Sequence, residues 1–286
     1  MKIMLFGTNT GIGLELTSML GESGHQILAY NFSDMDIRKE ETVNSILKTV
    51  NMDLIIYLSG YEKINEAEKE SQLAYDINAT GALNLSKVCK EKNIPLMYLS
   101  TSYVFDGTKP TPYDTKDAIN PLSEYGKSKA EAEKAILETI DKHYIIRTNK
   151  MFGVMKENFI DQIIEKVKTG QDIKAFDDLK YTPTWTFTLA KSIDRIITST
   201  NLKINYGLYH CTNSGVCSDF NLIADIMHSL NLYNKIYPVK YAETQQQPAL
   251  PLNSVLNCSN TPGIIIHWID ALHNYLMKKG YIEQQY

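Results

Sequence analysis

Short apolar runs alternate with segments of helical period through the first 150 residues, and this alternation constrains the fold more than any other feature of the chain. The apolar runs lie at 3–6, 26–30, 53–58, 95–99 and 144–147. Segments with apolar residues on one helix face lie between them, at 12–21, 40–50, 83–89 and 122–140. Buried strands that alternate with amphipathic helices are typical of a parallel sheet covered on both faces. The sequence therefore predicts an α/β fold with a doubly wound parallel sheet.

In the second half of the chain, apolar runs and helical segments alternate less regularly. We expect helices at 158–169, 186–199, 218–230 and 265–279, one more strand at 207–211, and a loop from Tyr237 to Pro251. Residues 1–150 are predicted to form a dinucleotide-binding domain, to which residues from about 186 to 212 return. Residues 151–286 are predicted to form mainly a smaller C-terminal substrate-binding lobe at the carboxyl edges of the strands, where open α/β sheets bind ligands.

Charge and composition exclude several classes of partner. The 29 basic and 33 acidic residues give a net charge of −4, and no long basic block is present, so nucleic-acid binding is not expected. No apolar run approaches the roughly 20 residues of a membrane span, and the N-terminus does not resemble a secretory signal. The four cysteines are far apart or without ligand spacing, which favours reduced thiols and a cytoplasmic protein.

A glycine-containing loop follows the first apolar run. Gly7 provides a sharp turn, Gly11 lets the backbone approach a pyrophosphate, and Gly13 lets the following helix pack closely. Backbone amides at the start of that helix then face the negative charge of the ligand. The loop predicts a Rossmann-type site for a dinucleotide, with contacts also from Thr10 and Ile12.

The residues after the second apolar run bear on the choice of cofactor. NAD-preferring sites usually carry an acidic residue there, whereas this chain has Asn31, Phe32 and Ser33. Asp36 follows a few residues later, where it is expected to contact the adenine together with Ile37. Because no carboxylate repels a 2′-phosphate and no arginine at 31–33 clamps one, we expect both NADP and NAD to bind, with a slight tilt to NADP.

The strongest signal for chemistry is Tyr125 followed four residues later by Lys129. This spacing places both side chains on one face of the helix predicted at 122–140. An ammonium group near a phenol is expected to lower the pKa of the phenol and to suit it for proton donation near neutral pH. Hydroxyl groups at Ser100, Thr101 and Ser102 follow the fourth apolar run and are expected beside the same pocket.

Matched segments along nearly the whole chain resemble the extended short-chain dehydrogenases/reductases, and specifically their dTDP-4-dehydrorhamnose reductase branch. Residues 99–107 resemble that branch's STDYVFDG segment, and residues 120–129 resemble the entry of its active-site helix. Residues 209–218 resemble its return strand and next helix start, 251–256 its RPxNSxL signature, and 268–272 its final helix.

The resemblance implies a reductase that uses NADP or NAD to reduce a 4-keto-6-deoxysugar attached to a nucleoside diphosphate. Thr101, Tyr125 and Lys129 would be catalytic, with Tyr125 as the proton donor. The cofactor would also contact the end of the third strand, at Leu58, Ser59 and Gly60. Substrate contacts are expected from Ser102, Tyr103, Val104, Lys150 and Trp185.

Several positions depart from the family pattern. Thr10 stands where the middle glycine is usual, and Ser102 where an aspartate follows the catalytic threonine. Residues 57–60 differ from the usual Asn-Ala-Ala-Ala, and Leu250 replaces the arginine of the RPxNSxL signature.

Two further departures concern the sugar pocket and metal binding. Lys150 stands where rhamnose-forming members carry an aromatic residue, and its cation is expected to pair with a substrate phosphate or carboxylate. Phe187 replaces a glutamate that binds magnesium in some members, so no metal is expected. The charged segment Glu62 to Glu70 is expected to be a solvated loop and helix start.

Two other functions remain open at this point. Some relatives, such as the regulatory subunit of methionine adenosyltransferase, resemble reductases but act as nucleotide-binding partners without catalysis. A nucleotide-sugar epimerase on the same fold is the other alternative. A homodimer is possible for any of the three.

Overall fold

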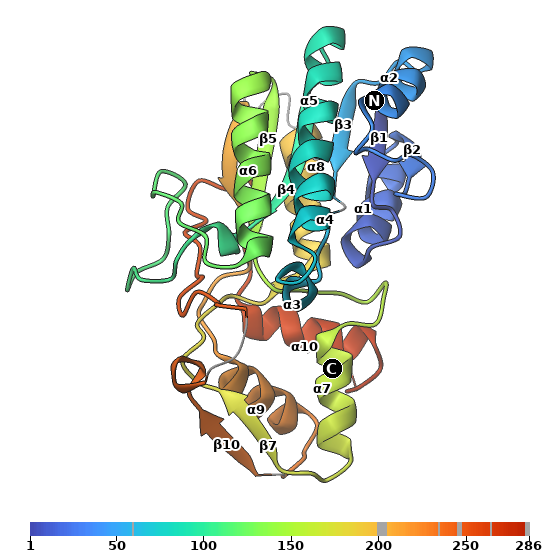
Figure 1. The fold of residues 1–286 in the computed structure, drawn as a ribbon. Coiled ribbons are helices and arrows are strands. Elements are labelled where there is room, and N and C mark those ends of the chain that lie inside the picture. The colour runs from blue at the N-terminus through green and yellow to red at the C-terminus, as the bar shows by residue number, and fades with distance from the viewer. Residues whose placement is uncertain (59, 199–204, 234, 245–247, 264, 284–286) are drawn as a thin grey trace.

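The computed structural model describes residues 1–286 except 59, 199–204, 234, 245–247, 264 and 284–286. Its centre is a six-stranded sheet in the order β2-β1-β3-β4-β5-β9 (Figure 1), and all neighbouring strands are parallel. The strands are β1 (Lys2–Phe6), β2 (Gln26–Tyr30), β3 (Leu54–Tyr57), β4 (Leu96–Thr101), β5 (His143–Thr148) and β9 (Gly207–His210). The predicted doubly wound parallel sheet is confirmed.

Helices cover both faces of this sheet. The helices on one face are α2 (Glu40–Thr49), α5 (Gly81–Lys92) and α6 (Glu124–Thr139), and those on the other are α1 (Gly11–Glu22) and α8 (Thr186–Thr198). Successive strand residues supply the two cores in turn: Met4 and Phe6 pack on the first face, and Ile3 and Leu5 on the second. Apolar side chains on both faces explain why the strands appear as continuous apolar runs.

A second group of elements lies below the sheet in Figure 1. It contains α7 (Phe159–Lys168), α9 (Asp219–Ser229) and α10 (Trp268–Lys278), which share an apolar core that includes Ile164, Leu222 and Leu272. Two small parallel sheets join it, β6 (Met151–Phe152) with β8 (Thr184–Trp185), and β7 (Ile173–Phe176) with β10 (Ile236–Val239). The division into a dinucleotide-binding domain and a substrate-binding lobe stays a prediction.

Short elements that the sequence pattern did not predict connect these layers. Helices α3 (Ile64–Ala67) and α4 (Ser71–Tyr75) and a π-helical turn (Asp76–Thr80) lie between β3 and α5, and 3-10 turns occur at Ser102–Val104 and Tyr241–Glu243. The predicted loop from Tyr237 to Pro251 is partly wrong, because its first residues belong to β10. Among the described residues, strand β10 pairs only with β7. It contains Pro238, which is tolerated because the strand lies at a sheet edge.

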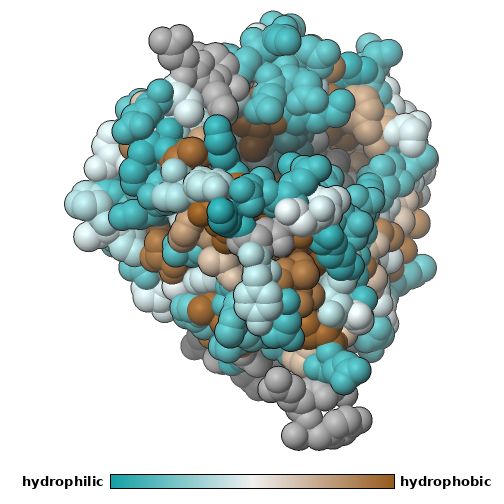
Figure 2. Space-filling view, turned by 90° about the horizontal axis from the view of Figure 1, so that it is seen from below, coloured by the Kyte–Doolittle hydropathy of each residue, from teal (hydrophilic) through white to brown (hydrophobic). Residues whose placement is uncertain are grey.

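The surface seen from below is mostly hydrophilic, with separate hydrophobic patches between the polar residues (Figure 2). All four cysteines are buried and unpaired. In the described part of the chain, no helix has both the length and the apolar character needed to cross a bilayer.

Candidate active site

The glycine loop forms a tight connection between β1 and α1. Gly7 adopts a positive φ of 91°, and its amide donates to the carbonyl of Tyr30 at 2.9 Å. The Thr10 hydroxyl caps α1: it accepts from the Gly13 amide at 3.1 Å and donates to the Gly7 carbonyl at 2.7 Å. Thr10, which replaces the family's usual glycine, therefore stabilises the loop through its side chain.

The other two glycines have different surroundings. A Cβ atom at Gly13 would lie 2.0 Å from the Gly7 carbonyl oxygen, so only glycine allows this close packing. A Cβ atom at Gly11 would find its nearest neighbour, the Cβ of Lys156, at 3.9 Å. Gly11 lines a cavity of about 150 Å³ with Thr10 and Ile12. The first turn of α1 begins at this cavity, and anion binding by its backbone amides stays a prediction.

Asn31 holds the glycine loop in place. Its side-chain oxygen accepts hydrogen bonds from the Thr8 hydroxyl and the Asn9 amide, each at 3.0 Å. The backbone amide of Asn31 donates to the Asp34 carboxylate at 2.8 Å. The side chain predicted to meet the cofactor ribose is therefore also a structural part of the phosphate loop.

Asp36 is paired within its own turn. Its carboxylate accepts two hydrogen bonds from the Arg38 guanidinium, at 2.8 and 2.9 Å, and this pairing lowers the pKa of Asp36. The guanidinium also lies 5.0 Å from the ring centroid of Phe32. Ile37 is buried in the core beneath this turn. Arg38 is a cation at the turn after β2 that the sequence analysis missed, because it lies outside residues 31–33.

The end of β3 approaches the catalytic helix α6. Leu58 is buried in the core, and Ser59 lies outside the described residues. A Cβ atom at Gly60 would lie 2.5 Å from Asn78 Oδ1 and 3.6 Å from Lys129 Nζ. Asn78 comes from the π-helical turn, a conformation common near functional sites, and its amide donates to the Ser128 hydroxyl at 2.8 Å. No motif in the sequence indicated a role for Asn78.

The three predicted catalytic residues line one cavity of about 290 Å³. Thr101 ends β4, and Tyr125 and Lys129 lie on the first two turns of α6, which Ser123 caps. Carboxyl ends of parallel strands meet at one edge of the sheet, which brings these segments together. The cavity is also lined by Glu62, Ile64, Leu99, Ser100, Tyr103, Thr148, Asn149, Lys150 and Met151.

Lys129 is buried at the floor of this cavity. Its ammonium donates to the Leu99 carbonyl at 2.6 Å and lies 4.3 Å from the ring centroid of Tyr98. Burial lowers the pKa of Lys129 to about 8, and the nearby carboxylates of Glu62 and Glu133 act in the opposite direction.

Tyr125 has a raised pKa, so the predicted lowering by Lys129 is wrong for this structure. Burial is the main cause, and the carboxylate of Glu62 adds to it, while a hydrogen bond with Thr101 lowers the pKa. The Lys129 ammonium contacts Leu99 and Tyr98, which explains why the four-residue spacing alone did not give the direction.

Of the predicted substrate-binding residues, some line the cavities at the sheet edge and others are buried away from them. Tyr103 lines the catalytic cavity, and its ring lies 6.2 Å from that of Tyr125 in an edge-on arrangement. Ser102 and Val104 are fully buried. Trp185 packs in the core of α7, α9 and α10, only 3% exposed, and is not among the described residues that line the cavities at the sheet edge.

A second cavity of about 190 Å³ adjoins the catalytic one, and Tyr103 and Lys150 line both. The Lys150 ammonium pairs with Asp219 at 2.7 Å and lies 4.7 Å from the ring centroid of Tyr181, whose hydroxyl donates to the same Asp219 oxygen at 2.6 Å. The cation expected to pair with a substrate phosphate or carboxylate is thus paired with a carboxylate of the chain itself. The other residues lining this cavity are Asn65, Phe176, Leu179, Lys180, Tyr181, Asp219, Tyr241, Pro248, Leu250, Pro251 and Ser254.

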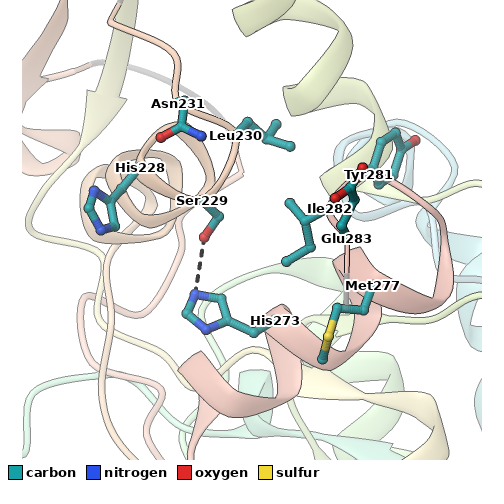
Figure 3. Close-up of a pocket in the computed structure, with 9 residues that line it drawn as sticks. All are labelled: His228, Ser229, Leu230, Asn231, His273, Met277, Tyr281, Ile282 and Glu283. Atoms are coloured by element: carbon teal, nitrogen blue, oxygen red, sulfur yellow. Dashed lines mark hydrogen bonds between the residues drawn. The ribbon is translucent and has the colours of Figure 1, made fainter. Parts of the chain in front are cut away.

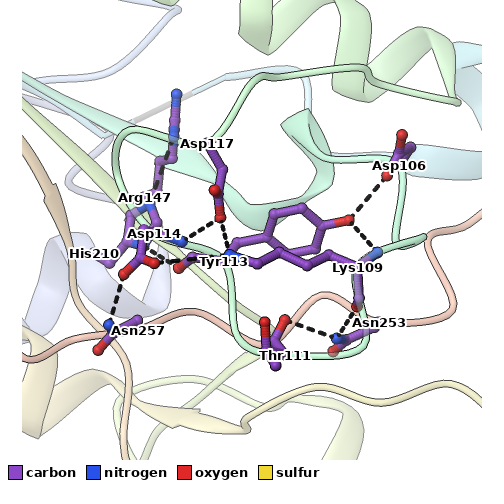
Figure 4. A network of polar contacts seen from close by, with 10 residues as sticks. All are labelled: Asp106, Lys109, Thr111, Tyr113, Asp114, Asp117, Arg147, His210, Asn253 and Asn257. Atoms are coloured by element: carbon purple, nitrogen blue, oxygen red, sulfur yellow. Dashed lines mark hydrogen bonds and ion pairs between the residues drawn. The ribbon is translucent and has the colours of Figure 1, made fainter.

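A polar network fixes the loop after β4 to the segment that lines this second cavity (Figure 4). Asn253 donates to the Lys109 carbonyl at 2.7 Å, and Asn257 donates to the Asp114 carboxylate at 2.6 Å. Hydrogen bonds from Thr108, Asn120 and Tyr113 hold the pKa of Asp106 well below its usual range.

The cavity drawn in Figure 3, of about 770 Å³, lies away from this site, between α9 and α10. His273 contacts Ser229 at 3.0 Å and Asp225 at 3.3 Å, but both contacts involve the same ring nitrogen, Nε2. A hydrolytic triad needs its carboxylate on the other ring nitrogen, so this arrangement does not provide one. No three acidic, histidine or cysteine residues of the described chain are grouped as metal ligands, and the absence of a metal stays a prediction.

Glu62 is a further cleft residue that the sequence analysis missed. Its side chain is exposed, yet it lines both the cavity at the glycine loop and the catalytic cavity. Surrounding protein raises its pKa, and Lys129 and Lys156 act in the opposite direction. The expected solvated segment therefore begins with a carboxylate that faces the site.

Comparison with known proteins agrees with this geometry. The family described as RmlD substrate binding domain matches residues 1–279. The spore coat polysaccharide biosynthesis protein SpsK of Bacillus subtilis is 29% identical and covers 98% of both chains. The dTDP-4-dehydrorhamnose reductase of Aggregatibacter actinomycetemcomitans is 29% identical over 87% of this chain and 88% of its own length.

Solved structures show the same similarity. A dTDP-4-dehydrorhamnose reductase from Clostridium acetobutylicum superposes with a TM-score of 0.90 at 29% identity, covering 96% of this chain and 98% of the other. The enzyme of that name from Bacillus anthracis, in complex with NADP, gives 0.90 at 28% identity, covering 97% and 99%. This chain therefore belongs to the RmlD substrate binding domain family of extended short-chain dehydrogenases/reductases.

Proposed function

We propose that this chain is an NAD(P)H-dependent reductase of a nucleotide-linked 4-keto-6-deoxysugar. The observation that carries the proposal is the single cavity lined by Thr101, Tyr125 and Lys129 at the carboxyl edge of the sheet. Relatives named dTDP-4-dehydrorhamnose reductase, similar over nearly the whole chain, support this reaction and a dTDP-linked substrate.

The residues at the glycine loop fit a dinucleotide. The open surroundings of Gly11 let a pyrophosphate approach the amides of Gly11 and Ile12 at the start of α1, whereas the Gly13 amide donates to the Thr10 hydroxyl. The turn after β2, with Asn31, Asp36 and Ile37, would hold the adenosine. When bound, the reduced nicotinamide supplies a hydride to a carbonyl carbon.

Each catalytic side chain has a separate role in this proposal. Tyr125 holds a proton on its phenol oxygen and gives it to the carbonyl oxygen of the sugar as that oxygen becomes an alkoxide. Thr101, which is hydrogen-bonded with Tyr125 in this structure, would turn its single hydroxyl hydrogen to the same carbonyl oxygen when substrate binds, and so orient it. Lys129, buried in the same cavity, would hold the nicotinamide ribose.

The substrate would extend from the catalytic cavity into the adjoining one. Tyr103 and Lys150 line both cavities, which supports the proposal that they contact the sugar and its diphosphate. The aromatic side chains of Phe176, Tyr181 and Tyr241 would then surround the nucleoside.

Cofactor choice is proposed to be broad, with a slight preference for NADP. No carboxylate stands at position 31 to repel a 2′-phosphate, and a relative at 28% identity has been solved with NADP. Competition between NADPH and NADH for the purified protein measures this preference, and we expect less than about a tenfold difference in affinity, which corresponds to less than about 1.4 kcal/mol.

Tyr125→Phe tests the assignment of the proton donor. The variant should retain cofactor affinity and lose about 10²–10⁴-fold in the rate of cofactor oxidation with a dTDP-4-ketosugar. Tyr144→Phe is the matched control, because Tyr144 lies at the opposite end of β5 from the site. Unchanged turnover in Tyr125→Phe would contradict the role of this residue.

The same assay separates the alternative functions. Tight cofactor binding with no turnover on any ketosugar would favour a non-catalytic binding subunit, and a changed sugar without net cofactor oxidation would favour an epimerase. A cytoplasmic location and a homodimer are parts of the proposal as well. The buried, unpaired cysteines support a reducing compartment.

A further inference from the structure

The cavity beside the glycine loop is closed on one side by residues 151–158, which lead from β6 into α7. Most of its lining comes from residues 10–12 and 151–158, which the hydrogen bond between Lys156 and Asn9 joins, and Glu62 and Thr186 complete it. Thr10, Gly11 and Ile12 form one wall, and Gly153, Lys156 and Asn158 belong to the other. A ligand at the glycine loop would contact both.

Lys156 reaches across this cavity to the loop. Its ammonium donates to the Asn9 carbonyl at 3.1 Å, and its Cβ lies 3.9 Å from the position that a Cβ at Gly11 would take. The side chain is exposed, and it forms no direct salt bridge with a carboxylate of the described chain. The ammonium is thus held beside the loop by one neutral acceptor, which an anion can replace at little cost.

The charges around the cavity make this cation important. Glu62 and Glu157 also line it, and Lys156 is the only cationic side chain among its described lining residues. A pyrophosphate adds negative charge to a site that already carries two carboxylates. Backbone amides at the start of α1 supply only partial positive charge, so a full cation is needed to offset the repulsion.

We propose that Lys156 is a cofactor-binding residue whose ammonium pairs with the pyrophosphate of the bound dinucleotide. The inference rests on the proposed use of a dinucleotide cofactor. Because Lys156 precedes α7, this contact joins the second group of elements to the nucleotide on the parallel sheet. Cofactor binding then steadies residues 151–158, of which Met151 also lines the catalytic cavity.

The test compares ligands with and without a pyrophosphate. Dissociation constants of NADPH, ADP-ribose and adenosine 2′-phosphate are measured by calorimetry for the wild-type chain and Lys156→Met. Lys166→Met is the matched control, since Lys166 is an exposed lysine on α7 and its loss changes the net charge equally. Lys156→Arg keeps the charge and should retain most of the affinity.

We expect Lys156→Met to weaken NADPH and ADP-ribose by about 10- to 100-fold, as for the loss of a charge-assisted hydrogen bond, and adenosine 2′-phosphate by less than about threefold. Lys166→Met should change none of them by more than about twofold. Equal weakening of all three ligands by Lys156→Met, or unchanged affinity, would overturn the inference. A wild-type chain that bound none of the three would instead contradict the proposed function, so the two failures are distinguishable.

Discussion

Replacing Gly13 by alanine should destabilise the fold, whereas the same replacement at Gly11 should leave its stability nearly unchanged. A Cβ at Gly13 would lie 2.0 Å from the Gly7 carbonyl oxygen and 2.8 Å from the Thr8 Cα, and real Cβ atoms essentially never come within 3.0 Å of such neighbours. The obstacle is backbone, so the loop or α1 has to move. At Gly11 the nearest neighbour is 3.9 Å away.

The magnitude follows from two opposing effects. Overpacking a tight contact costs about 1–3 kcal/mol, and the backbone obstacle at Gly13 places this site at the upper end. Alanine recovers about 1 kcal/mol through its higher helix propensity. The net loss at Gly13 is about 2 kcal/mol, which lowers the melting temperature by about 4–8 °C. Gly11→Ala has only the propensity gain and should be neutral or slightly stabilising.

Urea unfolding and a cofactor titration together test both roles. Gly13→Ala should lose unfolding free energy, while Gly11→Ala should keep its stability and bind NADPH about tenfold more weakly, about 1.4 kcal/mol, because its methyl group projects into the pyrophosphate cavity. Equal stability of the two variants, or a greater loss in Gly11→Ala, would refute this account of the loop.

Three further outcomes can be measured. Glu133→Gln should lower the free energy of unfolding, measured in urea, by about 3–5 kcal/mol, because the buried Arg147 guanidinium, 2.6 Å from a Glu133 carboxylate oxygen, loses its charged partner. Glu138→Gln, at an exposed position on the same helix, is the control and should leave this free energy unchanged. Burying the protonated ammonium of Lys129 costs free energy, and this cost is fully present below about pH 8 and disappears as pH rises towards the pKa of lysine in the unfolded chain. The unfolding free energy of the wild type relative to Lys129→Met should therefore increase between about pH 8 and 10. A difference that does not change with pH would contradict the burial argument. Asn31→Asp should shift the affinity ratio from NADPH towards NADH, and an unchanged ratio would mean that position 31 does not face the ribose.

The parallel sheet was predictable because its inner strands β1, β3 and β4 are buried on both faces, which gives continuous apolar runs. Ile55 packs towards α2 and α5, and its neighbour Ile56 towards α1 and α8, so neither can be polar. The short elements were not predictable in this way. Strands of two residues such as β6 and β8 have no period to detect, and tertiary contacts determine them.

The meeting of Thr101, Tyr125 and Lys129 was also predictable, because all three follow from the parallel topology. Charges brought in by later segments were not. Lys150 pairs with Asp219, which is 69 residues further along the chain, and Lys156 reaches back 147 residues to Asn9. Such pairs depend on how the second group of elements folds against the sheet, and no local spacing in the sequence predicts them.

The pKa of Tyr125, raised by burial and further by the carboxylate of Glu62, bears on the proposed chemistry. A reductase needs its proton donor to be protonated before the carbonyl is reduced, and burial together with the carboxylate of Glu62 keeps the phenol in that form. An alkoxide is a stronger base than a phenolate, so proton transfer to the reduced sugar remains favourable even from a phenol with a raised pKa. Oxidation of an alcohol would require the opposite, a tyrosine that readily becomes phenolate. The surroundings of Tyr125 therefore favour reduction: burial is the main cause of its raised pKa, and the carboxylate of Glu62, which the Tyr-Lys spacing could not reveal, adds to it.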